Sequence, residues 1–234
     1  MTALILDNVG KSFTLHLRGG VRLEAVRDVS LAVEPGECVV LGGPSGAGKS
    51  SILKMIYGNY RIDTGSIRVR DHTGAMVDLA TASPRQILDL RRTTLGYVSQ
   101  FLRVIPRVGA LDIVAEAARG NDVSEEAARR SARDLLSRLN IPERLWPLPP
   151  ATFSGGEQQR VNIARGLAAR RPILLLDEPT ASLDAENRRV VEALIEAKKQ
   201  AGVAIVGICH DADVRDAIAD RVVDVTRFGT AAAA

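Results

Sequence analysis

The stretch from residue 43 to residue 50, Gly-Pro-Ser-Gly-Ala-Gly-Lys-Ser, limits the folds open to this chain more than any other. It fits G-x-x-x-x-G-K-[ST], a loop whose glycines let backbone N–H groups turn inward around phosphate oxygens. An apolar run at 38–41 precedes it and a helix-like run at 51–56 follows it, which predicts a buried strand, the loop and then a helix. We therefore expect an α/β fold with a phosphate-binding loop.

The positions of this loop have separate expected roles. Lys49 is placed to reach the β and γ phosphates, Ser50 offers its hydroxyl to Mg²⁺, and the helix that begins there presents its positive dipole end to the same anion. The residues expected to hold the phosphates are Gly43, Ser45, Gly46, Gly48, Lys49, Ser50 and Ser51.

Composition limits the partners. A chain of 234 residues has room for one large α/β domain. A net charge of +3 suits a phosphate-handling protein, and 3% aromatic residues disfavour a stacking platform, so we predict no nucleic-acid partner. Cys38 and Cys209 are interpreted as core residues, which fits a reducing compartment. No apolar run approaches the roughly 18 residues of a membrane span, so we expect a soluble chain without direct membrane insertion.

The sequence predicts mainly strands in the first third of the chain and helices in the middle. The first third is predicted to form strands at 4–9 and 23–33, a turn at 18–20 and an edge strand at 66–70. Helices are predicted from residue 84 and over 124–139, and the proline-rich run 145–150 ends this part. Four arginines of the second helix are interpreted as a solvated face, the alternative being a phosphate or partner patch: Arg129, Arg130, Arg133 and Arg138.

The last third alternates strand and helix. Continuous apolar runs at 173–176 and 203–208, joined by a helix at 186–201, are typical of parallel strands covered on both faces. The first run ends in Asp177 and Glu178, at the sheet edge where α/β folds bind ligands. Asp177 is expected to hold Mg²⁺, directly or through water, and Glu178 to orient or deprotonate an attacking water.

A second glycine-rich helix start occurs at 154–160, Ser-Gly-Gly-Glu-Gln-Gln-Arg. One nucleotide has little need of two separate anion-binding helix starts. This segment closely resembles the signature of ATP-binding cassette (ABC) proteins, in which it binds the ATP held by the opposite subunit. The resemblance implies that Ser154, Gly155, Gly156 and Glu157 contact ATP across a head-to-tail dimer.

The same resemblance implies roles for four further residues. Gln100 matches the Q-loop glutamine, which touches Mg²⁺ and the attacking water, and Asp184 lies in a segment similar to the D-loop. His210 resembles the switch histidine at the γ-phosphate, and Phe13 occupies the place of the aromatic ring that stacks on adenine. His16 and His72 have no such support and are interpreted as surface residues.

The resemblance thus implies a P-loop NTPase of the ABC ATPase type, with a RecA-like core, an antiparallel β subdomain and a helical signature subdomain. We expect one domain at 1–228, with the helical subdomain at about 101–156 and a tail at 229–234. The implied cofactors are ATP and Mg²⁺, the implied catalytic residues Glu178, His210 and Gln100, and the implied metal ligands Ser50, Gln100 and Asp177.

Segments outside these motifs resemble one family more closely, the PhnL-type ABC subunit of the bacterial carbon-phosphorus lyase system. The segments are 54–60, 95–108, 142–146, 149–153 and 205–211. This resemblance implies a cytoplasmic protein with a role in phosphonate breakdown. That role is associated with synthesis of α-D-ribose 1-methylphosphonate 5-triphosphate, with ATP hydrolysis coupled to assembly or remodelling. The implied partners are the other lyase subunits and either a second copy or a second ABC subunit.

An alternative is the ATPase of a lipoprotein- or macrolide-export transporter, which residues 18–24 and 105–107 also resemble. Such ATPases often carry Thr-Val and then Glu-Asn where this chain has Gly109-Ala110 and Asp112-Ile113, a departure that favours the first interpretation. ABC proteins of DNA repair or chromosome maintenance would need coiled-coil or zinc insertions, for which the chain has no room.

Overall fold

The computed structural model describes residues 1–15, 20–100, 107–119 and 123–228. His16, most of the predicted turn at 18–20, the resemblance within 101–106 and the predicted tail lie outside the described residues. The strands are β1 (Leu4–Leu15), β2 (Val21–Val33), β3 (Cys38–Gly42), β4 (Thr64–Arg70), β5 (Met76–Asp78), β6 (Leu95–Val98), β7 (Ile173–Asp177), β8 (Ala204–Ile208) and β9 (Arg221–Asp224).

The α-helices are α1 (Lys49–Ile56), α2 (Pro84–Thr93), α3 (Ala110–Ala118), α4 (Glu125–Arg138), α5 (Gly155–Ala168), α6 (Ala185–Gln200) and α7 (Ala212–Ile218). Single 3₁₀ turns occur at Glu143–Leu145, Pro150–Thr152 and Val225–Phe228. Among the described helices, none combines the length and the apolar character needed to cross a bilayer.

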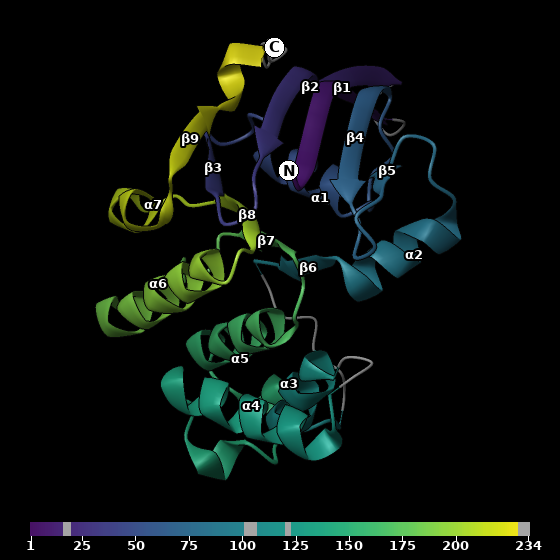
Figure 1. Ribbon diagram of the computed structural model, residues 1–234. Coiled ribbons are helices and arrows are strands. Elements are labelled where there is room, and N and C mark those ends of the chain that lie inside the picture. The colour runs from purple at the N-terminus through teal and green to yellow at the C-terminus, as the bar shows by residue number, and fades with distance from the viewer. Residues whose placement is uncertain (16–19, 101–106, 120–122, 229–234) are drawn as a thin grey trace.

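A five-stranded parallel sheet, in the order β6-β7-β8-β3-β9, lies at the centre of the molecule (Figure 1). Because all strands run the same way, their carboxyl ends meet at one edge. Gln100 follows β6, Glu178 follows β7, His210 follows β8 and the phosphate loop follows β3. The topology therefore brings the three predicted catalytic residues and the phosphate loop to one edge of the sheet.

The second sheet is antiparallel, in the order β2-β1-β4-β5. The prediction of an edge strand at 66–70 is wrong, because β4 pairs with β1 on one side and with β5 on the other. The edge strand beside β4 is β5, which has only three residues and follows a turn at Asp71, whose backbone N–H donates to the Ala75 carbonyl at 2.8 Å. Three residues are too few to display a strand pattern in the sequence.

The parallel strands are buried on both faces. Along β7, Ile173 and Leu175 belong to a core shared with α1 and the antiparallel sheet, while Leu174 and Leu176 belong to a core shared with the helices. This double burial explains why the strands read as continuous apolar runs rather than as alternating ones.

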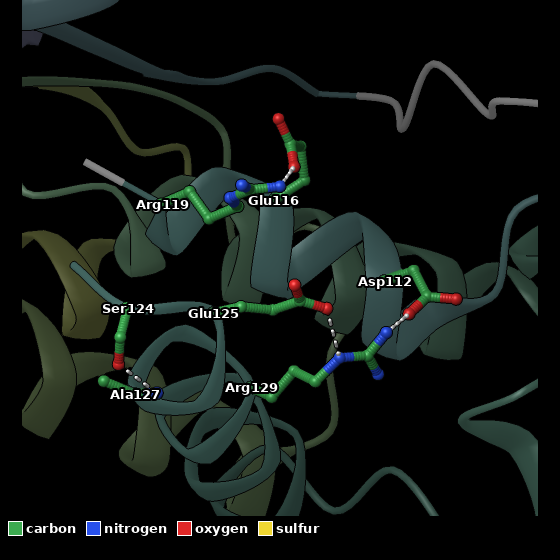
Figure 2. A network of polar contacts seen from close by, with 7 residues as sticks. All are labelled: Asp112, Glu116, Arg119, Ser124, Glu125, Ala127 and Arg129. Atoms are coloured by element: carbon green, nitrogen blue, oxygen red, sulfur yellow. Dashed lines mark hydrogen bonds and ion pairs between the residues drawn. The ribbon is translucent and has the colours of Figure 1, made fainter. Parts of the chain in front are cut away.

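The helical part, at the bottom of Figure 1, joins α3, α4 and α5 around one apolar cluster. On its surface the Arg129 guanidinium bridges Asp112 of α3 (2.8 Å) and Glu125 of its own helix (3.5 Å), as Figure 2 shows. Arg130 forms an ion pair with Glu126, one turn earlier in α4. Exposed pairs of this kind contribute about 0–1 kcal/mol each, and they support the interpretation of these arginines as a solvated face.

Candidate active site

The phosphate loop connects β3 to α1, and its positions require glycine for different structural reasons. Gly43, Gly46 and Gly48 all have positive φ angles, of 122°, 83° and 87°. At Gly48 a Cβ atom would lie 2.3 Å from the Ala25 carbonyl oxygen, so the fold itself excludes a side chain there. At Gly46 a Cβ would meet nothing within 4 Å, so its backbone faces open space, where an anion could approach.

A pocket of about 200 Å³ opens over this loop. It is lined by residues from the loop, from α1 and from the ends of β7 and β8: Ser45, Gly46, Gly48, Lys49, Ser50, Ser51, Glu178 and His210. The structure thus brings together most of the predicted phosphate-binding residues and two of the three predicted catalytic ones. The α1 N-terminus in this pocket has no side-chain cap, which leaves its N–H groups open to an anion.

Lys49 is the charged centre of the pocket. Its side chain is buried, with 8% of the residue exposed, and its ammonium donates hydrogen bonds to the carbonyl oxygens of Gly43 and Pro44, both at 2.7 Å. Burial lowers the pKa of this ammonium, while Glu178 acts in the opposite direction. Since its hydrogen-bond partners among the described residues are neutral carbonyls, this buried cation is suited to a phosphate, which would supply the missing negative charge.

Two oxygen donors beside the pocket fit Mg²⁺. The Ser50 hydroxyl donates to Asp177 Oδ1 at 3.3 Å, across the end of β7. The described residues hold no group of three or more His, Cys, Asp or Glu side chains able to bind a metal. Mg²⁺ is commonly held by one or two protein oxygens together with phosphates and water, so the pair fits this ion. The third predicted ligand, Gln100, makes its hydrogen bond to Glu178 instead.

The remaining oxygen of Asp177 is occupied by a residue that the motifs did not indicate. The Tyr97 hydroxyl donates to Asp177 Oδ2 at 2.8 Å, and burial together with this carboxylate raises the pKa of Tyr97. The Tyr97 ring stacks on Tyr57, with centroids 5.0 Å apart. Tyr97 therefore fixes the orientation of the carboxylate expected to hold Mg²⁺.

We expect Tyr97→Phe to weaken metal binding without unfolding the protein. The phenyl ring keeps the stack on Tyr57, but Asp177 Oδ2 loses its donor, and loss of such a supporting bond typically costs about tenfold in metal affinity. Electron paramagnetic resonance of Mn²⁺ bound with ADP measures this change directly. Tyr57→Phe is the control, and an unchanged Mn²⁺ affinity in Tyr97→Phe would contradict the positioning role.

Glu178 lies between the other two predicted catalytic residues. Its Oε1 accepts from His210 Nε2 at 2.8 Å, and its Oε2 accepts from Gln100 Nε2 at 3.3 Å. The backbone of Glu178 has φ 51°, a left-handed conformation that is unfavourable for a residue with a side chain. Its N–H donates to the Ile208 carbonyl at 3.0 Å, and this bond to β8 helps to hold the conformation. The arrangement aims a carboxylate at the phosphate pocket, where it can accept a proton from water.

A buried asparagine links Gln100 to the helical part. Asn162, on α5, is fully buried and donates through Nδ2 to the carbonyl oxygen of Ser99, the residue before Gln100. In the sequence, the only signal for this contact is a polar residue within the apolar stripe of α5. This hydrogen bond ties the backbone just before Gln100 to α5.

The segment at 154–160 begins α5 and does not line the phosphate pocket of its own chain. Ser154 and Glu157 form a capping box, in which Glu157 Oε2 accepts from the Ser154 hydroxyl at 2.7 Å and from its N–H at 2.9 Å. These hydrogen bonds lower the pKa of Glu157.

Neither glycine of this segment is required by the chain's own packing. A Cβ at Gly155 would meet nothing within 4 Å, and one at Gly156 would make an ordinary 3.5 Å contact with the Ser182 carbonyl oxygen. Neither residue has a positive φ. The absence of side chains here leaves the helix start open to a group from outside the chain.

Two other predicted residues also lie outside the phosphate pocket. Asp184 caps α6 by accepting from the backbone N–H of Asn187 at 2.8 Å. The Phe13 ring packs edge-on against Tyr60, with centroids 5.1 Å apart, beside the Lys11 ammonium. Contact of Phe13 with adenine stays a prediction.

Comparisons with known proteins agree with this geometry. Residues 26–181 match the sequence family described as ABC transporter. An uncharacterized ABC transporter ATP-binding protein of Mycobacterium tuberculosis is 36% identical over 211 residues, which are 90% of this chain and 62% of that protein. The lipoprotein-releasing system ATP-binding protein LolD 2 of Caulobacter vibrioides is 41% identical over 202 residues, 86% of each chain.

A solved structure extends the similarity to three dimensions. The dimeric structure of the ATP-binding cassette MJ0796, in a post-hydrolysis state bound to ADP and Pi, has a TM-score of 0.82 and 28% identity to this chain. The match covers 95% of this chain and 94% of that one.

Proposed function

We propose that this chain, which belongs to the ABC transporter family of ATP-binding proteins, hydrolyses MgATP with Glu178 as the base that activates water. The observation that carries the proposal is the position of the Glu178 carboxylate at the phosphate pocket, held by His210 and Gln100. ATP supplies the triphosphate, and Mg²⁺ offsets its negative charge when bound. Lys49 and the start of α1 bind the phosphates, while Ser50 and Asp177 hold the metal ion.

The full site is proposed to form between two cassettes. Ser154, Gly155, Gly156 and Glu157 of one chain face the nucleotide of the other, and Asp184 lies near the shared surface. The support is the open helix start at Gly155 and Gly156, together with the dimeric cassette to which this chain is similar. The division into one domain at 1–228 with a helical subdomain at about 101–156 belongs to the same proposal.

Beyond ATP hydrolysis, we propose that the chain works in the cytoplasm with carbon-phosphorus lyase subunits, in the synthesis of α-D-ribose 1-methylphosphonate 5-triphosphate. Support comes from the segments outside the shared motifs and from the departure at Gly109-Ala110, which packs against residues 146–148. The N–H groups of Ala110 and Leu111 donate to the carbonyls of Leu148 and Trp146, both at 3.0 Å. A Cβ at Gly109 would lie 2.8 Å from the Pro147 carbonyl oxygen. The departure from the transporter pattern at Gly109 is therefore part of the packing.

The second candidate function is the ATPase of a lipoprotein- or macrolide-export transporter. The observation that favours it is the similarity to the lipoprotein-releasing system protein of Caulobacter vibrioides over 86% of each chain. The two candidates share the ATPase chemistry and differ in the partner, which is a set of lyase subunits in one and a membrane permease in the other.

We expect tagged protein to co-purify with lyase subunits from detergent-free extract of the organism that encodes it. A strain that carries only Glu178→Gln should fail to grow on methylphosphonate as the sole phosphorus source and should grow normally on phosphate. The exposed-site variant Glu186→Gln is the control and should support growth on both. Recovery with a permease from detergent extract, with normal growth on methylphosphonate, would select the transporter candidate.

A further inference from the structure

A second cavity, of about 550 Å³, lies beside the phosphate pocket and shares no lining residue with it. Its walls come from α1, α2, β6, α5 and the end of β7, and both α2 and α5 contact β6. Three positively charged side chains line it: Lys54, Arg91 and Arg165. The ATPase mechanism described above uses none of these three.

The charges of this cavity are not balanced from within the described part of the chain. Lys54, Arg91 and Arg165 make no ion pair with any described carboxylate. Asp177 is the one acidic residue among the described lining residues, and its two oxygens already accept from Ser50 and Tyr97.

The two guanidinium groups are held in place by neutral partners. Arg91 Nε donates to the Tyr57 carbonyl at 2.9 Å and a second nitrogen donates to Asn59 Oδ1 at 2.8 Å, while the group lies 4.7 Å above the Tyr57 ring. Arg165 donates to Asn162 Oδ1 at 3.2 Å, and burial lowers its pKa. These contacts orient both groups without neutralising them, and partly buried cations are costly unless an anion accompanies them.

We propose that this cavity is a second anion site, which binds a small tetrahedral oxyanion, the phosphate or phosphonate group. Guanidinium groups donate two parallel hydrogen bonds to such an anion, and a lysine adds a point charge. The stacked rings of Tyr57 and Tyr97 offer an apolar wall to a small alkyl substituent. The proposal does not rest on the lyase role, because inorganic phosphate presents the same oxygens as an alkylphosphonate.

Isothermal titration calorimetry tests this site in the wild-type chain, with a non-hydrolysable ATP analogue and Mg²⁺ filling the phosphate loop. Inorganic phosphate and methylphosphonate, each titrated separately, should bind saturably with one anion per chain, and the tighter of the two identifies the natural source. Arg165→Gln and Arg91→Gln should each weaken binding about tenfold, since each removes charged hydrogen bonds. Arg92→Gln, an exposed arginine of the same helix as Arg91, should leave the affinity unchanged.

Lys54→Gln provides a second route if an arginine variant loses stability, because the Lys54 ammonium contacts the Tyr60 ring and makes no hydrogen bond to the described residues. Absence of saturable binding by both anions would overturn the proposal, as would equal affinities in wild type, Arg165→Gln and Lys54→Gln. Acetate binding as tightly as phosphate would overturn the assignment to a tetrahedral oxyanion.

Discussion

Replacing Glu178 by Gln should lower ATP turnover by about 10²–10⁴-fold while ATP still binds. The amide keeps the size of the side chain, and its single oxygen can still accept from His210, while its NH2 group can donate to Gln100 once the Gln100 amide turns its oxygen toward it, so most of the geometry is kept. An amide does not accept a proton from water near neutral pH, which removes the base. We expect hydrolysis to reopen the proposed dimer, so the variant should accumulate as an ATP-bound dimer.

Phosphate release measures the turnover, and size-exclusion chromatography with MgATP measures the dimer. Glu186→Gln is a suitable control, since it removes an exposed carboxylate from the first turn of α6 and leaves the site untouched. Turnover equal to that of the wild type in Glu178→Gln would show that another group acts as the base.

The parts of this fold that the sequence predicted well are those with strong local patterns. The strands β3, β7 and β8 are continuous apolar runs because both their faces are buried, and Ser83 with Gln86 gives α2 a capping box. The last strand, β9, was not predicted, because its exposed and half-buried residues form no such run. Likewise, α7 has only seven residues, less than the length at which helical periodicity is clear.

The residues of the candidate site likewise include some that the sequence could predict and some that it could not. Glu178, His210 and Gln100 could be placed together because each follows a strand of one parallel sheet, whose carboxyl ends share an edge. The contact of Tyr97 with Asp177 joins residues 80 positions apart, and a tyrosine within an apolar strand looks like a core residue. Contacts that depend on register and side-chain direction, such as this one, required the structure.

The largest effect expected outside the phosphate pocket concerns Gly156. We expect Gly156→Asp to keep the fold and ATP binding but to lower turnover by roughly 100-fold or more, because a carboxylate at the start of α5 would repel the phosphates of the partner's nucleotide. The fold should tolerate the change. A Cβ there meets only an ordinary 3.5 Å contact, and an acidic residue in the first turn of a helix is stabilising by about 0.3–1 kcal/mol.

A second glycine of the same helix gives the matched contrast. At Gly166 a Cβ would lie 2.2 Å from Val98 Cγ2, so Gly166→Ala should destabilise the chain by about 1–3 kcal/mol through overpacking. Thermal melting should thus separate the two variants, with a normal transition for Gly156→Asp and a lowered one for Gly166→Ala. Normal turnover in Gly156→Asp, or wild-type turnover that does not depend on protein concentration, would contradict a site completed by a second cassette. A glycine that its own chain does not need is best explained by the chain that binds opposite it.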